Sequence, residues 1–190
     1  AEDVFARFVS SNPTGNSASL ITLIAGALLD TGKQQDAVAW LDRLPPLDAV
    51  ADAFDAAIQE KRAGRMEKAH RYFQLAGDAV LTDAKALHEF AQVKMRLANK
   101  ARPRGRQGGS WNIHNRILEE AREMLQRVVQ MDAPRTRHAW AWYDLGRVLN
   151  LLRASKSDVR HAYEMAVGLE PLEPRFKEAL DQVDRRDGRE

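Results

Sequence analysis

The sequence contains no cysteine, which excludes disulfide bonds, thiolate zinc sites and a cysteine nucleophile. Long apolar runs are missing too. The longest, Leu20 to Leu29, is interrupted by Thr22 and Gly26 and is too short to span a bilayer. No run of alternating β-branched residues indicates a strand. The chain is 44% apolar and 29% charged, a balance typical of a folded protein. We favour a cytoplasmic location, but the compartment stays open.

Motifs for catalysis and for cofactor binding are also missing. No two of the five histidines have the His-x3-His spacing of a metal pair on one helical face, and there is no His-Glu-x2-His or phosphate-loop motif. The segment 105–109 is rich in glycine, but no strand precedes it, so it does not predict a nucleotide site. We therefore expect no enzyme, no cofactor and no metal centre.

Segments rich in Ala, Leu, Arg, Glu and Gln at helical spacing fill the chain between clusters of Gly, Pro and Asn. Short breaks between such segments favour consecutive antiparallel helix pairs. The pattern predicts an all-α protein of about ten helices, at residues 2–10, 17–31, 34–44, 47–63, 66–80, 83–101, 113–131, 136–152, 156–169 and 173–185.

The stretch from Trp142 to Leu149 resembles the first helix of a tetratricopeptide (TPR) repeat, Trp-x2-Leu-Gly-x2-Tyr, with Leu149 in place of the tyrosine. Tyr163 follows at the large position of the second helix, and Pro171 ends the unit. Small Gly146 would let the paired helix approach. The resemblance implies a right-handed superhelix of antiparallel helix pairs; a helical bundle or another solenoid is the alternative.

Earlier units match the pattern more loosely. Gly32 and Gly64 each precede a second-helix alanine, Ala37 and Ala69, by five residues. The next such alanine, Ala121, lies 52 residues after Ala69, about 18 residues more than the 34-residue period. We therefore expect an insertion, and the sequence places a basic loop at residues 102–112.

Residues 1–190 are expected to form a single TPR-like domain. Residues 1–13 have the spacing of the second helix of a truncated repeat, which suggests a segment of a larger protein and an exposed face for self-association. Residues 173–185 are predicted to form a C-terminal capping helix with a charged outer side.

The resemblance implies that partners bind on the inner face of the first helices. Counting from the small residue of each helix assigns a set of cations, amides and aromatics to that face. The predicted groove residues are Phe54, Lys61, Arg62, His88, Gln92, Arg96, Trp140, Tyr143, Arg147 and Asn150. This composition suits a protein or peptide partner with acidic residues.

A second candidate site is the basic insertion, which offers cations and an aromatic ring to an anion such as a phosphate backbone. Its residues are Lys100, Arg102, Arg104, Arg106 and Trp111. The alternative is a solvated loop whose Trp111 packs back on the helices. The predicted function is a protein–protein interaction scaffold. Nucleic-acid binding through the basic middle region, or a sensor domain attached to an effector, are the alternatives.

Overall fold

The computed structural model describes residues 24–28, 31–41, 46–103 and 108–187, and these residues form helices joined by short turns, without a strand. Residues 24–28 are helical. The other helices are α3 (Gln34–Leu41), α4 (Pro46–Arg62), α5 (Met66–Leu75), α6 (Ala79–Thr82), α7 (Ala84–Ala101), α8 (Gly108–Val128), α9 (Arg135–Leu151), α10 (Lys156–Leu169) and α11 (Pro174–Asp187). The predicted all-α architecture is confirmed.

The chain divides into two compact units, with the boundary between Val80 and Leu81. In the first unit, α4 packs against α5. Ala57 and Ala69 are fully buried between them, and the ring of Phe54 meets that of buried Phe73 edge to face at 6.0 Å. Small and large residues thus alternate along this helix pair.

The predicted helix 66–80 is wrong as one continuous element. Helix α5 ends at Leu75, Gly77 has φ +59°, and the short helix α6 starts at Ala79. A positive φ suits glycine and stops a right-handed helix, so Gly77 is a break that apolar periodicity alone does not reveal.

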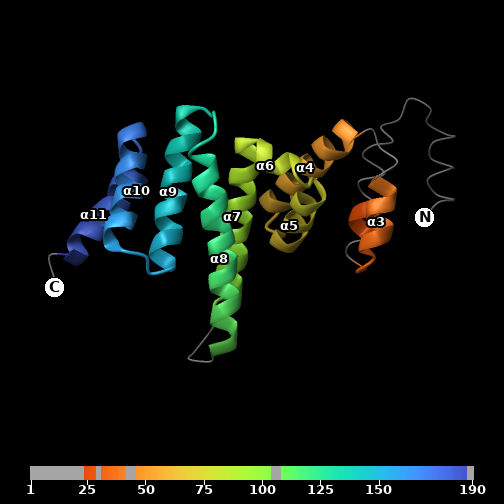
Figure 1. The fold of residues 1–190 in the computed structure, drawn as a ribbon, viewed down its shortest axis with the longest axis horizontal. Coiled ribbons are helices and arrows are strands. Elements are labelled where there is room, and N and C mark those ends of the chain that lie inside the picture. Colours follow the sequence, from red (N-terminus) through yellow and green to blue (C-terminus); the bar gives the residue numbers. More distant parts are fainter. Residues whose placement is uncertain (1–23, 29–30, 42–45, 104–107, 188–190) are drawn as a thin grey trace. The chain divides into compact units, whose positions relative to one another are not determined.

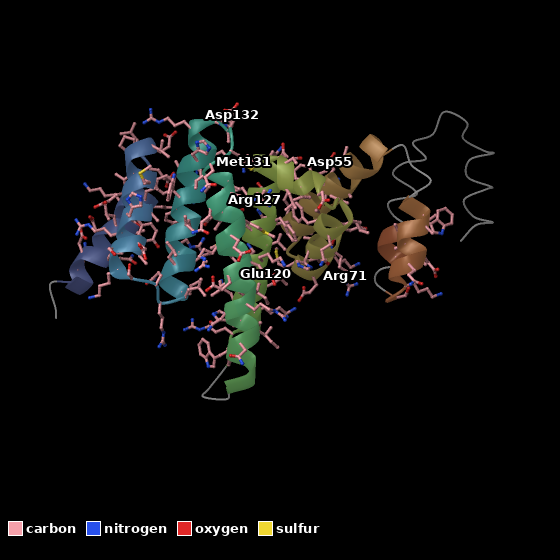
Figure 2. The ribbon with its side chains drawn as sticks, in the orientation of Figure 1. Asp55, Arg71, Glu120, Arg127, Met131 and Asp132 are labelled. Atoms are coloured by element: carbon pink, nitrogen blue, oxygen red, sulfur yellow. The ribbon has the colours of Figure 1, made fainter. Side chains whose placement is uncertain are left out.

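In the second unit each helix packs against the next, from α7 to α11, and α7 also contacts α9. Figure 1 shows successive helices α7, α8, α9 and α10 running in alternating directions. Within this unit, Nη2 of Arg127 on α8 donates to the Leu81 carbonyl at 3.1 Å (Figure 2 labels Arg127). Antiparallel pairing of neighbours in the chain is thus the rule in this unit.

Helices α9 and α10 approach each other closely at Gly146. A methyl group on its Cα would lie 2.6 to 3.0 Å from ring atoms of Tyr163, closer than carbon atoms pack. Tyr163 itself is only 5% exposed. The predicted packing of a small residue, Gly146, against a large residue of the partner helix, Tyr163, is therefore present.

Three turns share one backbone hydrogen bond, in which the residue after the turn's left-handed position donates to the carbonyl five residues earlier. The three pairs are Lys33 N to Leu28 O at 2.9 Å, Arg65 N to Glu60 O at 2.9 Å, and Ala154 N to Leu149 O at 3.0 Å. The left-handed positions are Gly32, Gly64 and Arg153, with φ of 77°, 79° and 57°. The three turns between paired helices therefore repeat the same backbone geometry.

The predicted basic loop at 102–112 is wrong at its far end. Helix α7 continues to Ala101 and α8 already starts at Gly108, so Trp111 lies inside a helix. The extra residues lengthen mainly α8, which has 21 residues against 14 in α10, and the hairpin of α7 and α8 projects past the end of α9 (Figure 1). Extension keeps backbone groups paired within each helix, which a long loop does not.

The last helix, α11, agrees with the predicted capping helix at 173–185, and Pro174 takes its first position, where a missing N–H costs nothing. Residues 1–13, predicted as part of a truncated repeat, lie outside the described residues. Among the described residues, no helix is both long and apolar enough to cross a membrane.

Candidate partner-binding face

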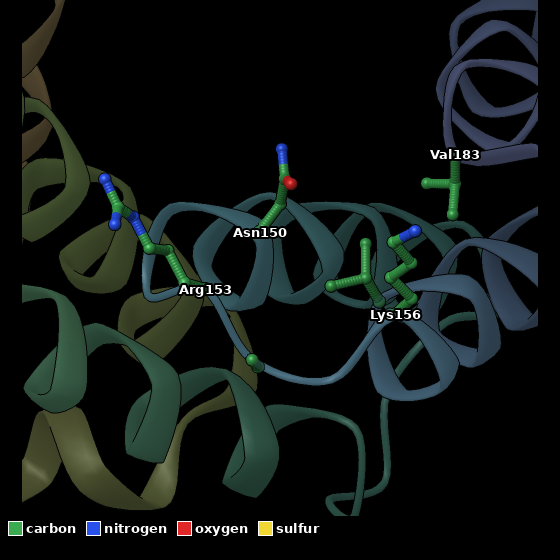
Figure 3. Close-up of a pocket in the computed structure, with 6 residues that line it drawn as sticks. Asn150, Arg153, Lys156 and Val183 are labelled. Atoms are coloured by element: carbon green, nitrogen blue, oxygen red, sulfur yellow. The ribbon is translucent and has the colours of Figure 1, made fainter. Parts of the chain in front are cut away.

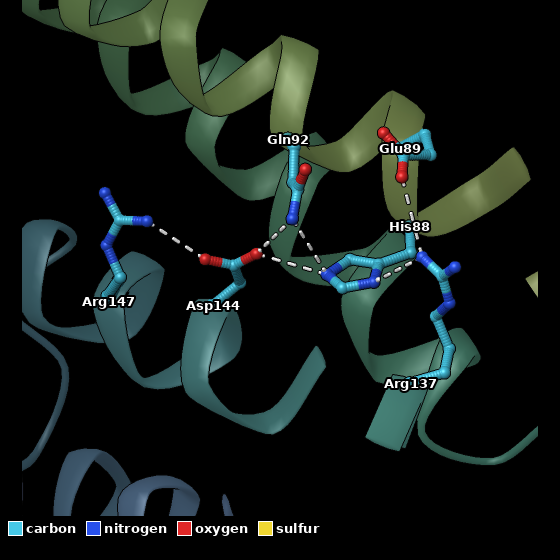
Figure 4. Close-up of polar contacts among 6 residues, drawn as sticks. All are labelled: His88, Glu89, Gln92, Arg137, Asp144 and Arg147. Carbon is cyan, nitrogen blue, oxygen red and sulfur yellow. Dashed lines mark hydrogen bonds and ion pairs between the residues drawn. The ribbon is translucent and has the colours of Figure 1, made fainter. Parts of the chain in front are cut away.

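A buried hydrogen bond joins α7 to α9 in the second unit (Figure 4). Nε2 of His88 lies 3.1 Å from Oδ2 of Asp144, and the two side chains are 2% and 4% exposed. Because carboxylate oxygens only accept hydrogen bonds, Nε2 carries the proton. The contact fixes the orientation of the His88 ring.

Arg137 of α9 approaches the other ring nitrogen. Its Nη1 lies 3.3 Å from Nδ1 of His88 and 3.6 Å from Oε1 of Glu89. A guanidinium only donates, so Nδ1 of His88 accepts, and the ring has the neutral Nε2–H form. Both ring nitrogens are therefore occupied by protein groups.

Two further donors complete the shell around Asp144. Nε2 of Gln92 donates to Oδ2 at 2.8 Å, and Nη1 of Arg147 donates to Oδ1 at 3.0 Å. Burial by itself raises the pKa of this carboxyl group, but the hydrogen bonds from His88 and Gln92 and the charge of Arg147 outweigh it. The pKa of Asp144 therefore lies below its ordinary value, and the group stays ionised.

A cleft of about 330 Å³ opens beside this network. It is lined by His88, Glu89, Gln92, Pro134, Thr136, Arg137 and Trp140. The lining comes from α7, from the start of α9 and from the proline before it, so the two helices shape it together. The cleft combines an aromatic ring, an amide and a guanidinium, which suits a peptide side chain.

Aromatic side chains continue the face of α9 toward α11. Phe176 of α11 is fully buried, and its ring lies 4.9 Å from that of Trp140 and 5.0 Å from that of Tyr143. Arg175 covers Trp140 at 5.1 Å. Trp140 and Tyr143, predicted as partner contacts, are therefore half-buried and serve the packing of α11 as well.

A second cleft, of about 390 Å³, lies at the other end of α9 (Figure 3). It is lined by Asn150, Arg153, Ala154, Lys156, Val159 and Val183. Arg147 lies one helical turn before Asn150 on α9, and both side chains are exposed. The exposed stripe of α9 thus runs from one cleft to the other.

The structure brings together only part of the predicted groove. His88, Gln92, Trp140 and Arg147 gather around Asp144 and the first cleft, whereas Asn150 lines the second. His88 is buried, so it supports this face rather than offering a surface. Arg96 lies one turn beyond Gln92 on α7 and is exposed.

The remaining predicted groove residues belong to the first unit. Phe54 contacts Phe73, Lys61 is only 9% exposed, and Arg62 is exposed at the end of α4. That these residues bind the same partner as those of the second unit stays a prediction.

The described residues of the predicted basic site, Lys100, Arg102 and Trp111, lie on the long hairpin of α7 and α8. Lys100 and Arg102 are exposed, while Arg104 and Arg106 lie outside the described residues. Trp111 is half-buried and meets the ring of His114 edge to face at 5.5 Å. His114 in turn donates from Nδ1 to the Ala98 carbonyl at 2.7 Å, which links α8 to α7.

Two residues central to this face were not predicted from the sequence. Asp144 lies inside the TPR-like stretch, and the available signal was an acid three residues before Arg147, the spacing of a helical ion pair. Arg137 reaches His88 over 49 residues, and no local pattern predicts such a pairing. Within the described ranges, no group of three or more His, Asp or Glu side chains is arranged to hold a metal ion.

No family model matches the sequence, and no curated protein matches it either. Solved structures of MamA, a TPR-like helical protein, do match. One MamA crystal structure has 16% identity and a TM-score of 0.59, covering 87% of this chain and 85% of its own. MamA residues 41 to the end from Desulfovibrio magneticus RS-1 have 19% identity and a TM-score of 0.59, covering 92% and 87%. At this identity the likeness is one of fold, and the chain has a TPR-like helical architecture.

Proposed function

We propose that this chain is a protein-interaction module that binds an acidic segment of a partner protein along the exposed stripe of α9. One observation carries the proposal: the buried Asp144 holds Arg147 in place between two clefts. An arginine whose position is already fixed loses little freedom when it pairs with a carboxylate.

The state of His88 supports binding rather than catalysis. A His–Asp pair is a familiar catalytic arrangement, but it requires a ring nitrogen that is open to the substrate. His88 is 1% exposed, and Arg137 and Asp144 occupy its two nitrogens. The pair therefore acts as a support for the neighbouring cations.

The proposal can be tested by selecting peptides from a random displayed library against the chain. The best peptide is then titrated calorimetrically into wild type and the Arg147→Ala variant. We expect acidic residues in the selected peptides and a loss of about tenfold in affinity for Arg147→Ala, equal to about 1.4 kcal/mol.

Arg122→Ala is the matched control, because Arg122 is 36% exposed and paired with Glu119 three residues earlier, much as Arg147 is 46% exposed and paired with Asp144 three residues earlier. It should bind as wild type does. Selected peptides that bind both variants equally well, or a library that yields no binder, would show that this face is not the site. Arg62→Ala tests in the same titration whether the first unit contributes.

A second candidate function is nucleic-acid binding, favoured by the hairpin of α7 and α8. From Phe90 to Leu118 the sequence has seven Lys and Arg residues and no Asp or Glu. The acids that border this segment are already paired: Glu89 with Arg137, Glu119 with Arg122, and Glu120 with Lys94 (Glu120 is labelled in Figure 2). The net positive charge of this segment attracts phosphate backbones.

A further inference from the structure

The turn between α9 and α10 contains a residue in a conformation that its side chain disfavours. Arg153 has φ 57°, and among the described residues it alone has a positive φ without being glycine. In this left-handed region a Cβ atom crowds the following carbonyl oxygen. Residues with backbone strain of this kind cluster at functional sites, which makes Arg153 a candidate for a functional role.

The earlier repeats show what the turn itself requires. Gly32 and Gly64 occupy the same position with the same hydrogen bond across the turn. No atom lies within 4 Å of a Cβ built on either glycine, so the preference for glycine there comes from the backbone alone. The last turn could use glycine equally well, yet it carries an arginine.

The Arg153 side chain lines the 390 Å³ cleft (Figure 3). Ala154, Val159 and Val183 give the cleft apolar walls, and Val159 is only 4% exposed. Asn150, Arg153 and Lys156 supply its polar groups, and the lining contains no acidic residue. An apolar interior with cations at its border fits a ligand that carries an apolar group next to a carboxylate.

Two acids close to the cleft do not pair with Arg153. Asp184, next to Val183 on α11, is bound by Arg160 at 3.2 Å. Asp158 accepts a hydrogen bond from the hydroxyl of Ser155 at 2.6 Å, at the start of α10. Neither contact involves Arg153, whose side chain makes no hydrogen bond or ion pair with the residues that the structure describes.

We infer that this cleft binds an apolar side chain of the partner segment together with an adjacent acidic side chain, which Arg153 holds. The inference rests on the proposed function, because Asn150 continues the stripe of Arg147 into the cleft. It adds a sequence preference to the partner: an apolar residue next to Asp or Glu.

The experiment uses two small probes, acetyl-Leu-Glu-amide and its neutral counterpart acetyl-Leu-Gln-amide, titrated into the ¹⁵N-labelled chain and followed by NMR. We expect shifts of the amides of Arg153, Lys156 and Val183, with the acidic probe binding at least about fivefold more tightly. Arg153→Gly should lower that affinity about fivefold and still raise the midpoint of thermal unfolding, because glycine relieves the turn.

Lys177→Ala, which removes one exposed cation from α11, is the control and should leave probe binding unchanged. Equal affinity for the two probes, shifts confined to other regions, or normal binding by Arg153→Gly would overturn the inference. The result is separate from the peptide selection. Selected peptides that need Arg147 but not Arg153 would remove this cleft and keep the proposed function. If the cleft binds the acidic probe but the library yields no peptide, the inference about the cleft would stand and the proposed function would fail.

Discussion

Oδ2 of Asp144 lies 3.1 Å from Nε2 of His88, and through this contact α9 is fastened to α7. The same carboxylate holds Arg147 through its other oxygen, at 3.0 Å. A single buried acid thus links the packing of two helices to the position of an exposed cation. Changes at Asp144 should affect stability and binding together, whereas changes at Arg147 should affect mainly binding.

Asp144→Asn should destabilise the second unit by about 1–3 kcal/mol at pH 7, because a neutral amide accepts weaker hydrogen bonds from His88 and Arg147. The pKa of Asp144 is lowered in the folded chain, so its carboxylate stabilises the fold above the ordinary value of about 3.9. That contribution is lost as the pH falls through the folded pKa.

Urea unfolding followed by tryptophan fluorescence at pH 7 and at acid pH measures both effects. Wild type should lose more stability than Asp144→Asn on acidification. If the two proteins show the same pH dependence, Asp144 does not carry this part of the acid sensitivity.

Gly146→Ala should destabilise the fold by about 1–3 kcal/mol, because the new methyl group overlaps the Tyr163 ring. Gly168→Ala in α10 is the matched control. A Cβ there meets nothing within 4 Å, so this helical substitution should stabilise by about 0.5–1 kcal/mol. Thermal unfolding of the two variants compares them directly, and shifts of the same sign would refute the close approach at Gly146.

Gly64→Ala should destabilise the first unit by about 1 kcal/mol, since its φ of 79° disfavours any residue with a Cβ. The open space around this position leaves no steric clash to contribute. Calorimetry of unfolding measures the change. An unchanged transition would show that the turn accepts a side chain freely, and it would weaken the comparison with Arg153.

Arg102→Ala with Arg116→Ala tests the nucleic-acid candidate, since both arginines are exposed on the α7–α8 hairpin. Wild type is titrated with a labelled single strand of about 20 nucleotides and followed by anisotropy. If both arginines contact phosphates, the double variant should reduce the slope of log affinity against log salt by about 1.4.

Lys177→Ala with Arg185→Ala removes the same charge from α11 and should leave that slope unchanged. Binding to vesicles with anionic lipids but not to the oligonucleotide would assign the hairpin to a membrane surface instead. Binding to neither would leave the hairpin without this role.

Local patterns predicted the helices and their pairing, because apolar spacing and turn glycines such as Gly64 are encoded within a few residues. The packing of Tyr163 against Gly146 was also predictable, since the repeat pattern places these residues opposite each other. The break at Gly77 and the helical start at Gly108 were not, because glycine is compatible with either a helix end or its interior. The network around Asp144 depends on residues about 50 positions apart, and their contact appears only after the repeats stack.

The insertion adds helix to the α7–α8 hairpin, most of it in α8. Helix α8 has 21 residues against 14 in α10, a difference of 7 residues (21 − 14) or about 10 Å at 1.5 Å per residue. Because the added turns lie beyond α9, the hairpin is an arm whose reach can change by whole turns while the contacts among α7, α8 and α9 keep their register. Evolution or design could therefore set how far the positive charge at its end stands from the Asp144 network without rebuilding the network.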